Sequence, residues 1–167
     1  MALPVVDLPD AWAVALSTGV WVGLSFGVGY VTHRAPVARF DHDTWLTRLR
    51  PIEADGRVYE RRLRIRRWKG RLPEGGDTFD GGFDKRRLRG RSTDLLERFA
   101  AETRRAEMTH WVLLVCGPLF VVWNRPLVAA GMVAFGVLFN APFIVTQRYN
   151  RARLARLLAR RRAAVPA

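Results

Sequence analysis

Three long runs without a charged residue constrain this chain more than any other feature of its sequence. No Asp, Glu, Lys or Arg occurs in residues 11–32, 108–124 or 126–147. A helix rises 1.5 Å per residue, so about 20 apolar residues cross a hydrocarbon core of about 30 Å. The first and third runs meet that length, and the second lies at its lower limit. We therefore expect an all-α membrane protein with three spans, built as one unit because 167 residues is the length of a single domain.

A short polar break separates the second and third runs. It consists of Asn124, Arg125 and Pro126. Asparagine and proline favour turns and arginine prefers water, so the two spans should form a tight antiparallel hairpin. In such a hairpin, residues whose numbers sum to about 250 lie at the same depth. His110 should therefore face the level of Asn140.

The distribution of basic residues predicts the orientation. Residues 33–107 contain 20 Lys or Arg and the tail from residue 148 contains 7, against none before the first run and one at the hairpin tip. Basic segments stay on the cytoplasmic side of a bacterial inner membrane, which places the amino terminus outside. The first run lacks a basic segment before it, so we interpret it as a retained span rather than a cleaved signal. The near absence of lysine among the 28 basic residues is typical of a GC-rich bacterial genome.

The expected architecture is one transmembrane helix, a basic cytoplasmic interfacial region at residues 33–107, a transmembrane helical hairpin and a basic tail helix at residues 148–167. Ser92, followed by Glu97, signals the start of an amphipathic helix over about residues 94–107. Residues 57–71 are compatible with helix or strand. Their apolar side chains are expected at the lipid headgroup boundary: Tyr59, Leu63, Ile65 and Trp68.

The polar residues at the predicted membrane entrance suggest chemistry. Glu107 and His110 are three residues apart, hence neighbours on one helix face, and a carboxylate can orient an imidazole as a general base. The alternative is an interfacial belt in which Trp111 anchors the helix and His110 is merely hydrated. Asn140 lies deep in an uncharged segment, where a polar side chain either faces a site or clasps a neighbouring helix.

A basic set could contact a phosphate-bearing ligand. Gln147 and Arg151 follow Asn140 at helical spacing and share its face. The remaining candidates are Trp68, Lys69, Arg104, Arg148 and Asn150. Headgroup anchoring is the alternative for the arginines. Spans on both sides make lipid, not nucleic acid, the expected partner of these residues. We expect no metal, because Cys116 is the only cysteine and no metal-ligand spacing occurs.

Three blocks, in this order, resemble the bacterial glycosyl-4,4'-diaponeurosporenoate acyltransferase family. The resemblance covers roughly residues 53–161. The first block is Arg67, Trp68 and Lys69 with Leu72 and Pro73; the second is residues 102–107 with His110 and Trp111; the third is Asn140 with Pro142 and residues 147–151.

The resemblance implies a membrane acyltransferase that moves a fatty acyl group onto a sugar hydroxyl of a glycosylated carotenoid or related glycolipid. We expect His110 to be the base, Glu107 its orienting partner and Asn140 a donor to the developing oxyanion. The basic set would hold the carrier of the acyl donor, expected to be acyl-CoA, and no cofactor is implied. The alternative is a non-catalytic scaffold that binds anionic lipid and recruits pathway enzymes. Homo-oligomerisation stays open.

Overall fold

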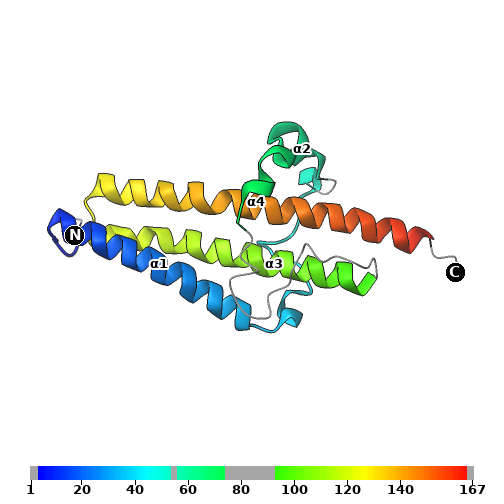
Figure 1. The fold of residues 1–167 in the computed structure, drawn as a ribbon, viewed down its shortest axis with the longest axis horizontal. Coiled ribbons are helices and arrows are strands. Elements are labelled where there is room, and N and C mark those ends of the chain that lie inside the picture. Colours follow the sequence, from blue (N-terminus) through cyan, green and yellow to red (C-terminus); the bar gives the residue numbers. More distant parts are fainter. Residues whose placement is uncertain (1–3, 54–55, 74–92, 165–167) are drawn as a thin grey trace.

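The computed structural model describes residues 4–53, 56–73 and 93–164, and every regular element in these ranges is helical (Figure 1). This confirms the predicted all-α class. The α-helices are α1 (Asp10–Arg34), α2 (Arg57–Arg62), α3 (Thr93–Cys116) and α4 (Pro126–Ala164). The 3-10 helices are η1 (Val37–Phe40), η2 (Pro51–Glu53), η3 (Ile65–Arg67), η4 (Lys69–Arg71) and η7 (Gly117–Val122).

The three long helical rods, α1, α3 with η7, and α4, lie side by side along the long axis of the molecule (Figure 1). Three segments are long and apolar enough to cross a membrane: Asp10–Arg34, Thr93–Val122 and Pro126–Ala163. Many large apolar side chains on them face outward, among them Trp12, Leu127 and Leu138, which are 69%, 86% and 75% exposed. Outward apolar side chains are what a lipid environment requires, so the structure is that of a membrane protein.

The predicted hairpin is confirmed. Helix α3 ends at Cys116 and continues as η7, because Pro118 has no N–H to bond the carbonyl one turn earlier. The chain turns after Val122, and α4 starts at Pro126, the first-turn position that proline favours. The amphipathic segment expected over residues 94–107 and the second span form one continuous helix. Its proposed cap, Ser92, lies outside the described residues.

A polar clasp joins α1 to the hairpin tip. The Trp123 indole N–H donates to Ser17 Oγ at 3.0 Å, and the Asn124 amide donates to the same oxygen at 3.1 Å. All three side chains are buried. At the other end of α1 the hydroxyls of Thr32 and Thr109 lie 2.9 Å apart. These bonds fix the height of α1 against α3 where apolar packing alone leaves helices free to slide.

The segment from Gly56 to η4 packs on the outer side of α4 (Figure 1). Tyr59 and Ile65 are 6% and 0% exposed and pack against Tyr149, whereas Leu63 is exposed. Their expected place at the headgroup boundary stays a prediction. Gly56 begins this segment with a φ of 70°, a left-handed conformation that favours glycine.

Candidate active site

His110 and Asn140 meet across the hairpin, as their numbering predicts. His110 Nδ1 lies 2.9 Å from Asn140 Oδ1, and Asn140 Nδ2 donates to the Gly136 carbonyl at 2.9 Å. A carbonyl only accepts, so this second bond fixes which end of the amide faces the histidine. Nδ1 must then carry the proton and donate it, which leaves the lone pair on Nε2. The geometry therefore selects one tautomer of His110.

The imidazole is also held on its face. Its ring stacks on Phe143 with 4.6 Å between centroids and 14° between planes. Phe143 lies three residues after Asn140, so one face of α4 supplies both contacts. An aromatic face stabilises a cation above it, so this partner favours a protonated imidazole once it has accepted a proton. His110 is half-buried, while Asn140 is fully buried.

Glu107, one turn before His110 on α3, is fully buried and holds two arginines. Arg148 Nη1 donates to Glu107 Oε1 at 2.7 Å, and Arg151 Nη2 donates to Oε2 at 2.6 Å. The Trp111 indole N–H donates to Oε1 at 3.1 Å. The contact found at His110 Nδ1 is thus with Asn140, whereas the Glu107 carboxylate accepts hydrogen bonds from the two arginines of α4 and from Trp111. The orienting role expected for Glu107 stays a prediction.

Arg148 uses every one of its five N–H groups within the protein. Two go to the carbonyl oxygens of Leu46 and Arg48, at 2.9 and 2.8 Å. Two go to Glu53, at 2.9 and 2.7 Å, and the fifth goes to Glu107. A guanidinium has five donors and no acceptor, so none is left for a phosphate in this arrangement. Arg148 joins the 41–53 loop to α3.

Glu53 is the outer partner of this arginine. Burial alone would raise the pKa of Glu53, but the hydrogen bond from Arg148, and then those from Tyr59 and the Arg50 backbone N–H, outweigh it and lower the pKa to about 2. Burial, together with the hydrogen bond to Glu53, raises the pKa of the Tyr59 hydroxyl. Glu53 is therefore ionised at any physiological pH and keeps the loop attached to α4.

Arg151 and Arg104 meet the same loop through Asp43. Arg104 Nε donates to Asp43 Oδ1 at 2.6 Å, and Arg151 Nε lies 3.8 Å from that oxygen. Arg151 is 2% exposed and also donates to the Thr47 carbonyl. Its Nε and Nη1 make no hydrogen bond within the protein. Arg151 thus keeps donors that Arg148 has used.

Lys69 and Asn150 form a second group, on the outer face of α4. Lys69 Nζ donates to Asn150 Oδ1 at 3.1 Å and sits 4.9 Å from the centre of the Tyr149 ring. Trp68 packs on the same cluster, and its indole N–H donates to the Leu63 carbonyl. Gln147 is buried on α4, and its Oε1 has no hydrogen-bond partner within the protein. The ten predicted site residues therefore lie in three places: between α3 and α4, on the side of these helices that meets the 41–53 loop, and on the outer face of α4.

Sequence reasoning missed three contributors. Asp43 and Glu53 lie in an irregular loop, where spacing gives no signal of what they contact. Phe143 had a usable signal, because it follows Asn140 by one helical turn. No three His, Cys, Asp or Glu side chains come together as a metal site among the described residues.

The family model for glycosyl-4,4'-diaponeurosporenoate acyltransferase matches residues 42–160 of this chain. Proteins of that name from Staphylococcus aureus strains USA300 and COL are each 28% identical over 139 residues, covering 83% of this chain and 83% of the relative. The one from the bovine strain RF122 is 27% identical over the same length and coverage. No solved structure matches. The matched range contains every site residue named above, whereas α1 lies outside it.

Proposed function

The chain belongs to the glycosyl-4,4'-diaponeurosporenoate acyltransferase family, and from that membership we propose that it moves a fatty acyl group onto a sugar hydroxyl of a glycosylated carotenoid or related glycolipid. The observation that carries the mechanism is the bond between His110 and Asn140. It supports a single histidine tautomer, held by Asn140 on the neighbouring helix, and a base in one tautomer is what deprotonation of a hydroxyl needs.

In the proposed step, His110 Nε2 accepts the proton of the sugar hydroxyl as its oxygen attacks the acyl carbonyl carbon. The carbon–oxygen bond forms, the bond from the acyl carbon to the sulfur of an acyl thioester breaks, and the imidazolium returns its proton to the leaving thiolate. Asn140 is assigned as a positioning residue in this scheme, because it is fully buried, its Oδ1 faces His110 and one of its two amide N–H groups donates to Gly136. The oxyanion role first expected for Asn140 stays a prediction. Phe143 supports the imidazolium.

We propose acyl-CoA as the donor, with its phosphates held by cations on α4 and the segment beside it. Asn150, to which Lys69 donates, lies ten residues beyond Asn140, about 15 Å along α4, so the carrier arm would bridge that distance. Arg104, Trp68, Gln147 and Arg151 remain candidates for substrate contact. Arg148 is reassigned to positioning, because a phosphate would have to displace one of its five internal bonds.

The proposed location is a bacterial inner membrane with the amino terminus outside and the basic loop and tail in the cytoplasm, where acyl-CoA is made available. The basic residues of residues 33–107 and of the tail support this orientation. A reporter fused after Ala167 should be active as a cytoplasmic fusion. Alkaline phosphatase activity from the same position would contradict the orientation and the donor together.

The direct test is acyl transfer by purified protein given palmitoyl-CoA and a glycosylated lipid. Replacing His110 with alanine should lower turnover by roughly 10²- to 10⁴-fold, the contribution of a positioned general base. His42→Ala is the matched control, because His42 is an exposed loop histidine. Equal turnover by the two variants would refute the mechanism. No turnover by the wild type with any acyl donor would instead favour a scaffold.

A further inference from the structure

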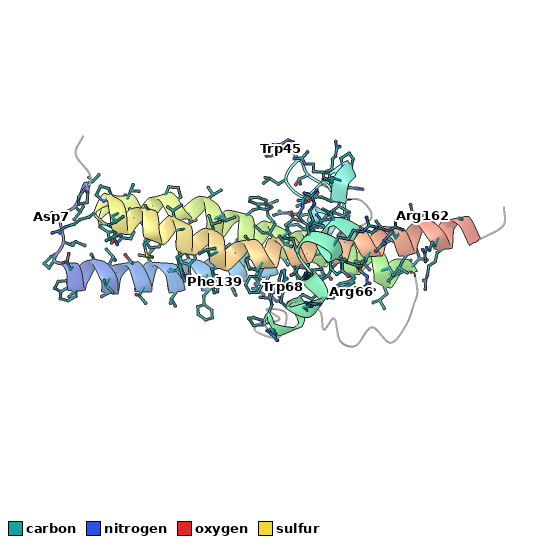
Figure 2. All side chains as sticks on the ribbon, turned by 90° about the horizontal axis from the view of Figure 1, so that it is seen from above. Asp7, Trp45, Arg66, Trp68, Phe139 and Arg162 are labelled. Carbon is teal, nitrogen blue, oxygen red and sulfur yellow. The ribbon has the colours of Figure 1, made fainter. Side chains whose placement is uncertain are left out.

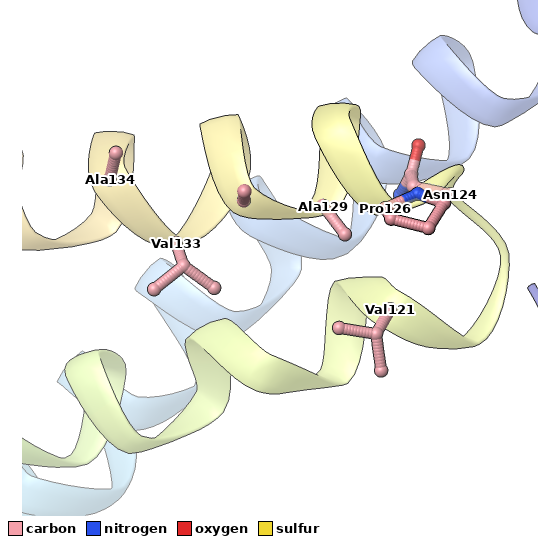
Figure 3. A pocket seen from close by; sticks show the side chains of 7 residues that line it. Val121, Asn124, Pro126, Ala129, Val133 and Ala134 are labelled. Atoms are coloured by element: carbon pink, nitrogen blue, oxygen red, sulfur yellow. The ribbon is translucent and has the colours of Figure 1, made fainter. Parts of the chain in front are cut away.

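An open apolar groove lies between η7 and the start of α4, at the hairpin end of the molecule (Figure 3). Its volume is about 440 Å³. Its apolar lining consists of Val121 from η7 and Pro126, Ala129, Ala130, Val133 and Ala134 from α4. The one polar residue of the lining, Asn124, is already bonded to Ser17 and to the Phe120 carbonyl. The groove therefore offers small apolar side chains and no polar group in need of a partner.

The groove lies on the same seam as His110. On α4, Ala130, Val133 and Asn140 are three and seven residues apart, so they share a helix face. On the other side, His110 and Gly117 are seven residues apart, where α3 passes into η7, and Val121 follows in that 3-10 helix. Gly117 sits against Val133, where an added Cβ would lie 3.9 Å away. The absence of a side chain at Gly117 lets η7 approach Val133, which itself lines the groove.

The distance along the seam is fixed by the helix rise. Ala134 is 6 residues from Asn140, about 9 Å along α4, and Pro126 is 14 residues away, about 21 Å. The groove thus begins one to two helical turns from the base and ends near the hairpin tip. An extended hydrocarbon chain whose first carbon reacts beside His110 would run along this seam and end in the groove.

We infer that this groove receives the far end of the donor's fatty acyl chain and limits the chain length that the enzyme transfers. The inference rests on the proposed acyl transfer at His110. The donor chain is favoured over the apolar body of the acceptor, because the acyl carbon is itself the reacting atom and its chain starts at the base. The acceptor's apolar part begins only beyond its sugar. A pocket of this size with an apolar lining is of the kind that takes a single apolar ligand.

Filling the groove should shorten the preferred chain. Ala134→Phe and Ala130→Phe add bulk inside it at partly open positions, and Val128→Phe adds an aromatic ring on the lipid-facing side of the same helix as a matched control. The assay compares octanoyl-, lauroyl-, palmitoyl- and stearoyl-CoA. Both groove variants should lose roughly ten-fold or more in kcat/KM for the longest donors, the discrimination expected of a blocked apolar pocket, and keep wild-type rates with the shortest. Ala134→Phe should shift the optimum further, because it lies closer to Asn140.

Other occupants give different results. If the acceptor's chain fills the groove, Ala134→Phe will raise the KM for acceptor equally with every donor, and the inference is wrong. If only bulk lipid fills it, the groove variants will match Val128→Phe with every donor, which also refutes it. A palmitoyl-CoA with a terminal diazirine gives a readout that needs no turnover. Crosslinks should map to residues 121–134, and their absence there would overturn the inference even if acyl transfer itself failed to be detected.

Discussion

Replacing Glu107 with glutamine should destabilise the protein more than any other single removal of a carboxylate charge on α3. Glu107 is fully buried and takes charge-assisted hydrogen bonds from Arg148 and Arg151 at 2.7 and 2.6 Å. Each such bond contributes about 1.5–3 kcal/mol, and breaking a buried ion pair by removing one partner costs about 3–5 kcal/mol. Arg151 would keep its bond to the Thr47 carbonyl, and its remaining anionic partner would be Asp43, at 3.8 Å. We expect a loss of about 3–5 kcal/mol in the free energy of unfolding.

The measurement is reversible unfolding in mixed detergent micelles, followed by tryptophan fluorescence. Glu97→Gln is the matched control on the same helix, because Glu97 and Arg162 form a pair at 3.1 Å that is 50% and 73% exposed, and such pairs contribute about 0–1 kcal/mol. The double variant Glu107→Gln with Arg151→Gln should recover part of the loss, since it removes the uncompensated charge. Equal unfolding free energies for Glu107→Gln and Glu97→Gln would refute the reasoning.

Three further outcomes follow from the same contacts. Asn140→Ala should lower kcat with little change in KM, because a positioning residue acts through the base. Asn140→Asp should move the pH profile of kcat to higher pH, since a carboxylate favours imidazolium. A pure loss of expression in these variants would contradict the positioning role. The pKa of Glu53 is about 2 in the folded protein, against 4.5 ordinarily. The stabilisation of the fold by ionised Glu53 should therefore be complete above about pH 4.5 and should decline as the pH falls toward 2. Glu53→Gln should lack this decline. Arg148→Lys should expose the 41–53 loop to trypsin, because three donors cannot replace five, whereas Arg125→Lys at the exposed hairpin tip should not.

The spans, the hairpin and the pairing of His110 with Asn140 were all predictable from the sequence. Each depends on a rule with a fixed period or length: the uncharged runs on the thickness of a membrane, the turn on Asn124 and Pro126, and the pairing on equal rise in two antiparallel helices. Errors do not accumulate over so short a hairpin. His110 and Asn140 are 30 positions apart in the sequence, and the chain between them contains no loop beyond the turn.

The partners of the charged residues were not predictable in the same way. Local spacing predicted that Glu107 lies near His110, but it gave no signal of the two arginines from α4 that hold the Glu107 carboxylate. Glu53 lies 95 residues from Arg148, in a segment without periodicity, so no sequence pattern relates them. Two of the four bonds that the loop makes to Arg148 come from backbone carbonyls, which are independent of residue type. Figure 2 shows Trp45, in the same loop, standing clear of the long helices, where it is 76% exposed.

The buried charges explain how an apolar hairpin holds its base in register. Apolar faces in lipid gain little by choosing one height over another, so the register of α3 against α4 depends on polar contacts. Glu107 supplies two of them one turn from His110. The Ser17, Trp123 and Asn124 clasp fixes α1 against the hairpin tip. A slip of one residue would move His110 by about 1.5 Å and break its bond to Asn140. The desolvated network contributes little net stability compared with apolar packing, so its main effect is to hold the tautomer-selecting bond in place.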